Sequence, residues 1–176
     1  MALEHALLVA LREHPSSGLD LAKRFSRSIG YFWSATHQQI YRVLSRMESD
    51  GWVSVEAVAQ TGRPDKKVYD VTATGRRVLA GWLAEPAAAA PLRSDLAVKM
   101  RGASFGERSD VLAVVEAELA EHRLRLDVYE QLMTREHPAP EQLEGRDLDQ
   151  HLVLRGGILM EQTWITWLNE YLEAHR

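Results

Sequence analysis

A run of side chains that can bind nucleic acid lies between residues 36 and 50 of the chain. Its apolar residues recur every three or four positions, as on the inward face of a helix, and the opposite face presents Gln38, Arg42 and Ser45. Amide and guanidinium groups pair with adenine and guanine edges through two hydrogen bonds, and hydroxyls bind phosphates. No acidic residue precedes Glu48 in this run. An ordinary solvated helix face is the alternative. We favour DNA contact, and the candidate residues are Thr36, Gln38, Gln39, Tyr41, Arg42, Ser45 and Arg46.

A second group of cations follows on a turn that contains glycine and proline. Arg63, Lys66 and Lys67 are separated by no charge other than that of Asp65. Three cations on such a turn suit phosphates or a minor groove. A basic loop is often only a solvated loop, so its position after the candidate helix is what favours DNA binding.

The sequence offers no catalytic or metal-binding pattern. Its histidines and serines fall in no nucleophile elbow, phosphate loop or zincin motif. His122 and His151 have acidic neighbours but lack the His-x-x-x-His or Glu-x-x-His spacing of a metal site. We therefore expect no enzymatic activity, no cofactor and no metal. A polar residue such as His122 in a helical seam more often fixes the register of packing.

Composition places these residues in a folded protein. The 176 residues are 45% hydrophobic and 26% charged, which excludes collagen-like and disordered chains. The absence of cysteine excludes disulfide scaffolds, thiolate zinc sites and cysteine nucleophiles. The net charge of −4 conceals an asymmetry, because residues 1–85 carry 11 Lys and Arg against 9 Asp and Glu, and residues 86–176 carry 10 against 16. A polyanion would therefore meet the first half.

No segment resembles a signal sequence or a membrane span. The apolar stretch at 6–11 is short and lies between Glu4 and Arg12. We expect a cytoplasmic protein that makes no contact with a membrane.

Hydrophobic periodicity and capping residues predict the elements that position the candidate residues. In chain order they are a helix at 2–13, a second helix capped by Ser17, a turn at 28–30, a third helix from Thr36 to Asp50, strands at 52–60 and 68–71 around a polar turn at 61–67, and a helix capped by Thr72 that ends before Pro86. Three helices followed by a β-hairpin are the order of a winged helix-turn-helix, whose third helix enters the major groove. We assign residues 1–85 to this DNA-binding domain.

The second half is expected to form a helical domain at 92–176, after a proline-bounded spacer at 86–91. A short helix at 92–101 precedes two long ones. The first carries a coiled-coil seam from Leu112 to Met133, and the last, at about 148–172, is apolar on two faces. The fold class is therefore mainly α, with an N-terminal winged helix and a C-terminal helical domain.

A terminal helix that is apolar on two sides needs two partners, which favours a homodimer. The candidate dimerisation residues are Leu3, Leu7, Leu112, Leu119, Leu126, Leu154, Ile158, Ile165, Leu168 and Leu172. The second apolar face of the last helix runs through Leu152, Leu159, Trp164, Trp167 and Tyr171. Its aromatic residues Trp164, Trp167 and Tyr171 are candidates for a pocket that binds a small aromatic or hydrophobic effector, with plain packing as the alternative. Phe32 and Trp33 are expected to be core or interface anchors.

Several spaced motifs run through residues 2–83. They are His-Ala-Leu-Leu at 5–8, Ser-Gly-x-Asp-Leu-Ala-Lys-Arg-Phe at 17–25, Gln-Ile-Tyr-Arg-Val-Leu at 39–44, Met-Glu-x-x-Gly at 47–51, Gly-Arg-Pro at 62–64 and Val-Tyr-x-x-Thr-x-x-Gly at 68–75. In this order they resemble the PadR family of bacterial transcriptional regulators. The C-terminal half resembles the longer PadR subgroup in its architecture.

The resemblance implies a homodimeric winged-helix repressor that binds a palindromic operator in double-stranded DNA and is released by a small effector. It implies DNA contacts at Gln38, Gln39, Tyr41 and Arg42, and a wing that carries Arg63 and Lys66. The chain departs from the family at Leu19, where members commonly have Tyr or a polar residue able to contact a phosphate.

Two alternatives stay open at the level of sequence. One is a dimeric protein-interaction adaptor whose winged domain does not bind DNA, which Leu19 and the small positive excess of the first half leave open. The other is a MarR-like fold, whose dimer helices flank the winged domain at both ends. Too few residues precede the second helix for that arrangement.

Overall fold

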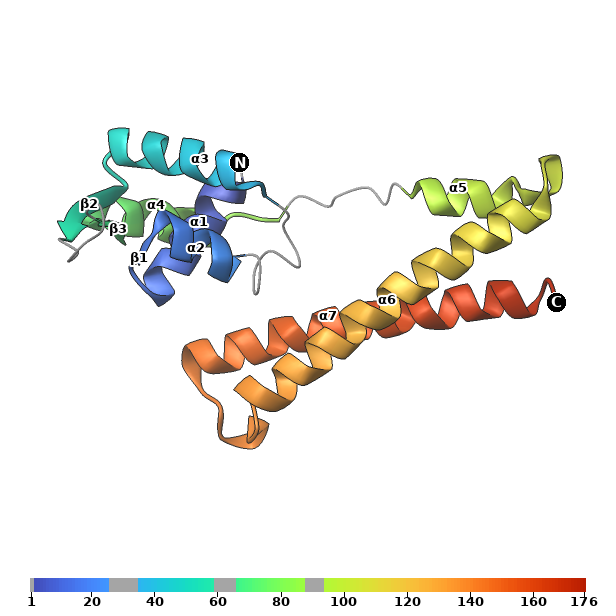
Figure 1. Cartoon of the computed structure of the whole chain (residues 1–176). Coiled ribbons are helices and arrows are strands. Elements are labelled where there is room, and N and C mark those ends of the chain that lie inside the picture. Colours follow the sequence, from blue (N-terminus) through green and yellow to red (C-terminus); the bar gives the residue numbers. More distant parts are fainter. Residues whose placement is uncertain (1, 26–34, 59–65, 88–93) are drawn as a thin grey trace. The chain divides into compact units, whose positions relative to one another are not determined.

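The computed structural model describes residues 2–25, 35–58, 66–87 and 94–176 (Figure 1). The chain falls into two compact units, Met1–Ala89 and Ala90–Arg176, and each has its own hydrophobic core. The division falls inside the spacer expected at 86–91. The turn expected at 28–30, Phe32, Trp33 and Arg63 lie outside the described residues.

The described part of the first unit contains four helices and a three-stranded sheet. In chain order they are α1 (Ala2–Glu13), β1 (Ser16–Ser17), α2 (Gly18–Phe25), α3 (His37–Ser49), β2 (Val53–Val58), β3 (Lys66–Val71) and α4 (Ala73–Leu83). Three helices, a β-hairpin and a fourth helix follow one another as the sequence predicts.

Caps at both ends fix the length of α3. At its start the Thr36 hydroxyl accepts a hydrogen bond from the backbone N–H of Gln39 (3.2 Å), and the Gln39 side chain accepts one from the Thr36 N–H (2.8 Å). This reciprocal capping box satisfies two N–H groups that have no partner within the helix. At its end Gly51 has φ of 69°, a left-handed conformation that glycine adopts without strain.

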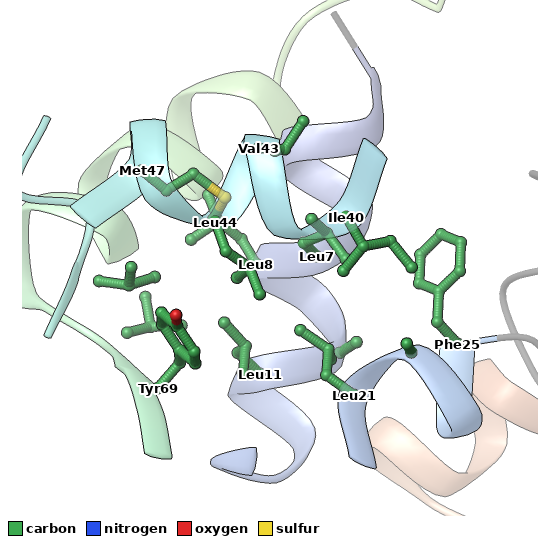
Figure 2. Close-up of a cluster of buried hydrophobic side chains, with 14 of the residues drawn as sticks. Leu7, Leu8, Leu11, Leu21, Phe25, Ile40, Val43, Leu44, Met47 and Tyr69 are labelled. Carbon is green, nitrogen blue, oxygen red and sulfur yellow. The ribbon is translucent and has the colours of Figure 1, made fainter. Parts of the chain in front are cut away.

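Helix α3 packs its one apolar face on the rest of the unit. Ile40, Leu44 and Met47 are almost completely buried, and Figure 2 shows them pointing toward Leu7 and Leu8 of α1. Each large apolar side chain that leaves water in this way contributes about 1.5–3 kcal/mol. Because the buried residues recur at helical spacing, burying them turns the opposite face of α3 away from the core.

The sheet has the strand order β1–β3–β2, with antiparallel neighbours. In its register Ser16 lies opposite Tyr69 and Val53 opposite Val71. Strand β1 could not be predicted, because two serines show neither the length nor the apolar alternation of a strand.

The predicted boundary of the second hairpin strand is wrong. Lys66 and Lys67 were expected in the polar turn, but both belong to β3, where they pair with Val58 and Ala57. Backbone pairing with β2 extends the ladder beyond the apolar residues that marked the strand in the sequence.

Arg24 of α2 ties the start of the unit together. Its guanidinium donates hydrogen bonds to the carbonyls of Ala10 and His14, both at 3.0 Å, and to the Ser16 hydroxyl at 2.7 Å. A cation at the end of α1 suits the partial negative charge of the last carbonyls of a helix. The contacts hold α2 and β1 against α1.

A close backbone contact joins α4 to the residues that follow α3. The Thr72 hydroxyl accepts from the N–H of Gly75 (3.1 Å) and donates to the carbonyl of Gly51 (2.7 Å). A Cβ on Gly75 would lie 2.1 Å from the carbonyl oxygen of Trp52. Only glycine fits there without a shift of the main chain.

All the described elements of the second unit are helical. They are α5 (Asp95–Arg101), the 3-10 turn η2 (Ala103–Phe105), α6 (Arg108–Glu136), the 3-10 turn η3 (Pro140–Gln142) and α7 (Gly145–Glu173). Helices α6 and α7 run in opposite directions and lie against each other (Figure 1). Among the described residues, no helix combines the length and the apolar character needed to cross a membrane.

The seam predicted on α6 forms the core of this unit. Val115 and Leu119 are buried with Leu168 and Leu172 of α7 and with Met100 of α5. The seam on α6 therefore faces a helix of the same chain. Two long antiparallel helices joined by a short connection bury part of their apolar surface against each other within one chain.

A polar cluster interrupts this apolar core. The Nδ1 atom of His122 lies 2.5 Å from Glu161 Oε2, and Arg125 donates to Glu161 Oε1 at 3.2 Å. The His122 ring stacks on Trp164 with centroids 5.1 Å apart. A paired polar group in a seam permits few alternative registers, which supports the role expected for His122.

The close contact at Gly75 predicts opposite effects for two glycines of one helix. Gly75→Ala is expected to destabilise the protein by about 2 kcal/mol or more, because the new methyl group must displace the main chain at Trp52. Gly81→Ala is the matched control, since a Cβ there meets nothing within 4 Å, and it is expected to stabilise by about 0.5–1 kcal/mol. Urea unfolding measures both changes. The same sign for both would contradict the close contact.

Candidate nucleic-acid interface

The face of α3 opposite the core is polar and exposed. Gln38, Arg42 and Ser45 lie there at helical spacing, and all three side chains are exposed. Among the described residues, Arg42 has no ion-pair partner. The structure thus brings together the central residues of the predicted surface, with an amide and a guanidinium that can reach base edges in a major groove.

Two further candidates, Thr36 and Gln39, stand at the first turn of α3. Both are exposed, but their side chains form the capping box described above. Their hydrogen-bonding groups therefore already hold the start of the helix.

Tyr41 lies on one flank of the exposed face and leans on the start of α2. A Cβ on Gly18 would lie 2.5 Å from Tyr41 Cε1 and 2.9 Å from its Cζ. Gly18 thus leaves room for the Tyr41 ring. The Tyr41 residue remains 45% exposed. The sequence identified the Ser-Gly pair as a motif but gave no sign of this contact. Leu19, which follows Gly18, is exposed.

Arg46 lies on the other flank and is ion-paired with Glu4 of α1. Glu4 is buried, with 5% of the residue exposed, whereas the Arg46 side chain is about half exposed. Arg46 was expected among the DNA contacts, and no partner for it was predicted. One local signal was present. Glu4 lies on the same face of the helix as Leu8 and Leu11, and it is a charged residue on an otherwise apolar face.

The two described lysines of the hairpin differ in their surroundings. Lys66 Nζ lies 2.6 Å from Asp20 Oδ2, whereas Lys67 is exposed. The hydrogen bond from Lys66, followed by that from Ser17, lowers the pKa of Asp20 below its ordinary value. The Asp20–Lys66 pair is partly exposed, so solvent screens it. It connects β3 to the start of α2.

The three aromatic residues predicted for an effector pocket lie in different surroundings. Trp164 stacks on His122, and the Tyr171 hydroxyl donates to the Met100 carbonyl at 3.0 Å, so both pack within the second core. Trp167 is exposed, and its ring centroid lies 5.2 Å from that of Trp164. The three residues lie at helical spacing on one face of α7, as the sequence predicts, and their part in binding an effector stays a prediction.

Several residues expected at a dimer interface are buried inside their own subunit. Leu7 lies in the core of the first unit, and Leu119, Leu168 and Leu172 lie in that of the second. These four predictions are wrong, because the four leucine side chains are buried in the cores of their own chain. The other predicted residues are half-buried, namely Leu3, Leu112, Leu126, Leu154, Ile158 and Ile165.

An apolar strip remains exposed on the outward face of α7. It consists of Leu152, Val153, Leu159, Met160 and Trp167, each more than one-third exposed. At helical spacing these residues lie on one side, opposite the face that packs on α6. A shallow hollow of about 400 Å³ lies on the same face, and its lining includes Leu159, Thr163 and Trp167.

Two histidines at the end of the α6–α7 pair lie close together. The rings of His137 and His151 are 5.3 Å apart, nearly perpendicular, and their buried Nδ1 atoms have no hydrogen-bond partner in the described part of the chain. In that same part, no group of three or more metal-ligating side chains is found.

Comparison with known proteins assigns each half to a described family. Residues 7–81 match the model of the transcriptional regulator PadR-like family, and residues 92–176 match that of the virulence activator alpha C-terminal region.

Curated relatives and solved structures match nearly the whole chain. A probable transcriptional regulator of Mycobacterium tuberculosis is 50% identical, with 99% of this chain and 97% of the relative covered. The negative transcriptional regulator PadR of Bacillus subtilis is 27% identical, with 97% and 95% covered. Both are named as regulators and neither as an enzyme.

The fold is that of solved winged-helix regulators. The virulence activator AphA of Vibrio cholerae has a TM-score of 0.80 at 30% identity, with 98% of this chain and 96% of AphA covered. Bacillus subtilis PadR in complex with operator DNA has a TM-score of 0.87 at 24% identity, with 99% and 98% covered. With one relative sharing half of its residues along nearly its entire length, this chain belongs to the PadR-like family of transcriptional regulators.

Proposed function

We propose that this regulator is a cytoplasmic homodimer that inserts α3 into the major groove of a palindromic operator. The observation that carries the proposal is the exposure of Gln38, Arg42 and Ser45 on one side of a helix whose other side is buried. The structure of Bacillus subtilis PadR with operator DNA supports the same activity for this chain.

The residues of the surface have different tasks in this proposal. Arg42 donates two hydrogen bonds to a guanine, and Gln38 pairs with an adenine. Ser45 and Tyr41 bind phosphates, as does Lys67 of the wing with Arg63. Thr36, Gln39 and Lys66 lie at the margins, where their side chains hold α3 and β3 in place.

The exposed strip on α7 supports the homodimer. Five large apolar side chains on one side of a helix are unusual on the surface of a monomer. A second copy offers the same strip, so two α7 helices can cover each other around a two-fold axis. Such a dimer also matches the symmetry of a palindromic operator.

We further propose that the protein is a repressor released by a small aromatic or hydrophobic effector. The relative from Bacillus subtilis is a negative regulator, and its structure with p-coumaric acid has been solved. AphA is named as an activator, so the sign of regulation needs its own test. Trp167 beside the hollow on α7, together with Trp164 and Tyr171, is the candidate effector region.

Replacement of Arg42 tests direct reading of the operator. The operator is first selected by the protein from random duplex DNA, and binding is measured by fluorescence anisotropy at several salt concentrations. Arg42→Ala is expected to weaken operator binding by about 1–3 kcal/mol for each subunit, because each copy of α3 loses one base contact, and binding to random DNA much less. Equal weakening on both DNAs would assign Arg42 to phosphate. A stable dimer that selects no sequence would favour the adaptor alternative.

Replacement of Trp167 tests the dimer. Trp167→Glu places a charge in the centre of the exposed strip and is expected to shift the protein from dimer to monomer in sedimentation analysis. Glu116→Lys on the exposed side of α6 is the control, and it should leave the dimer intact. A Trp167→Glu protein that remains a dimer at micromolar concentration would place the interface elsewhere.

Release by an effector is testable on the same operator. Hydroxycinnamic acids such as p-coumaric acid are titrated into the complex, and the operator affinity is expected to fall at least about tenfold, since a ligand shifts an equilibrium only by its differential affinity.

A reporter gene behind the operator should be expressed more strongly when the regulator is deleted. Lower expression upon deletion would identify an activator.

A further inference from the structure

Glu4 is a carboxylate placed in the buried face of α1. Its side chain is 7% exposed, and its neighbours at helical spacing, Leu8 and Leu11, are core residues. Taking a carboxylate out of water without a partner is strongly unfavourable. Arg46 of α3 supplies the opposite charge. The guanidinium is therefore held at the point where α3 meets the first turn of α1.

The apolar contacts of α3 decide which of its faces is buried, but hydrophobic attraction has no direction and does not by itself fix the exact angle of the helix. A charge-assisted hydrogen bond does have one. In the described part of the chain, two contacts flank the exposed face of α3: Tyr41 against Gly18 of α2, and Arg46 with Glu4 of α1. At helical spacing these two lie on opposite flanks of the face that carries Arg42.

We propose that Glu4 and Arg46 are positioning residues that set the orientation of α3 on the operator, and that Arg46 does not itself bind DNA. If Arg46 turned toward a phosphate, Glu4 would stay buried without its cation. The paired residues carry no net charge, so Arg46 adds nothing to the phosphates that the protein neutralises. This inference rests on the proposed DNA binding, but its first test does not.

The first test is a double-mutant cycle on the melting temperature of the full chain. Glu4→Gln and Arg46→Gln are each expected to lower Tm by about 4 °C or more, and the double variant by no more than the worse single one. Arg42→Gln, on the exposed face of the same helix, is the control and should stay within about 2 °C of the wild type.

The second test compares operator and random DNA at a temperature where every variant is folded. Removing a negative charge by itself strengthens binding to a polyanion. Our proposal predicts the reverse for Glu4→Gln on the operator, a loss of about tenfold or more, with random DNA changed by less than about threefold. For Arg46→Gln we expect the same loss of selectivity and an unchanged dependence of affinity on salt.

Two results would overturn the proposal. One is an Arg46→Gln protein with an unchanged Tm and a salt slope reduced by about two units, one for each subunit, which would make Arg46 a phosphate ligand. The other is a Glu4→Gln protein that binds the operator more tightly. If the wild type binds no DNA, the proposed function fails, while the cycle on Tm still decides whether the pair orients α3 on α1.

Discussion

The first unit depends on the burial of the one apolar face of α3 against α1 and α2. Because Ile40, Leu44 and Met47 must leave water together, the helix can lie in the core in only one rotation. The same rotation turns Gln38 and Arg42 outward. The burial of one face of α3 in the core therefore also determines which residues form the candidate interface. The hairpin and α4 then close the core around it.

In the second unit the corresponding constraint comes from α7. One side of this helix packs on α5 and α6 around Leu168 and Leu172, and the opposite side remains apolar and exposed. A chain with two long helices can cover only one of these sides. A second copy of the chain can cover the exposed side with its own α7. A two-fold dimer of this kind would present two copies of α3 to a symmetric operator.

Features that depend on local spacing could be predicted from the sequence. Thr36 and Gln39 are three residues apart, so the start of α3 was predictable, and Gly51 marked its end. The outward residues of α3 followed from the same periodicity. The family motifs over residues 2–83 gave the order of the elements.

Features that depend on contacts between distant segments could not be predicted. Glu4 and Arg46 are far apart in the chain, and nothing in their separation marks a pair. The Lys66–Asp20 pair, the strand β1 and the contact of Tyr41 with Gly18 likewise exist only once the chain is folded. The packing of Tyr171 on α5 and of Trp164 on α6 could not be predicted either, since periodicity does not reveal where these helices lie.

The most direct test of α3 as the reading helix is dimethyl sulfate footprinting on the selected operator. The reagent methylates guanine N7 in the major groove and adenine N3 in the minor groove. Our account predicts protection of guanine N7 in two clusters about one helical turn apart, one for each subunit. Unprotected guanines, or protection confined to minor-groove adenines, would contradict it.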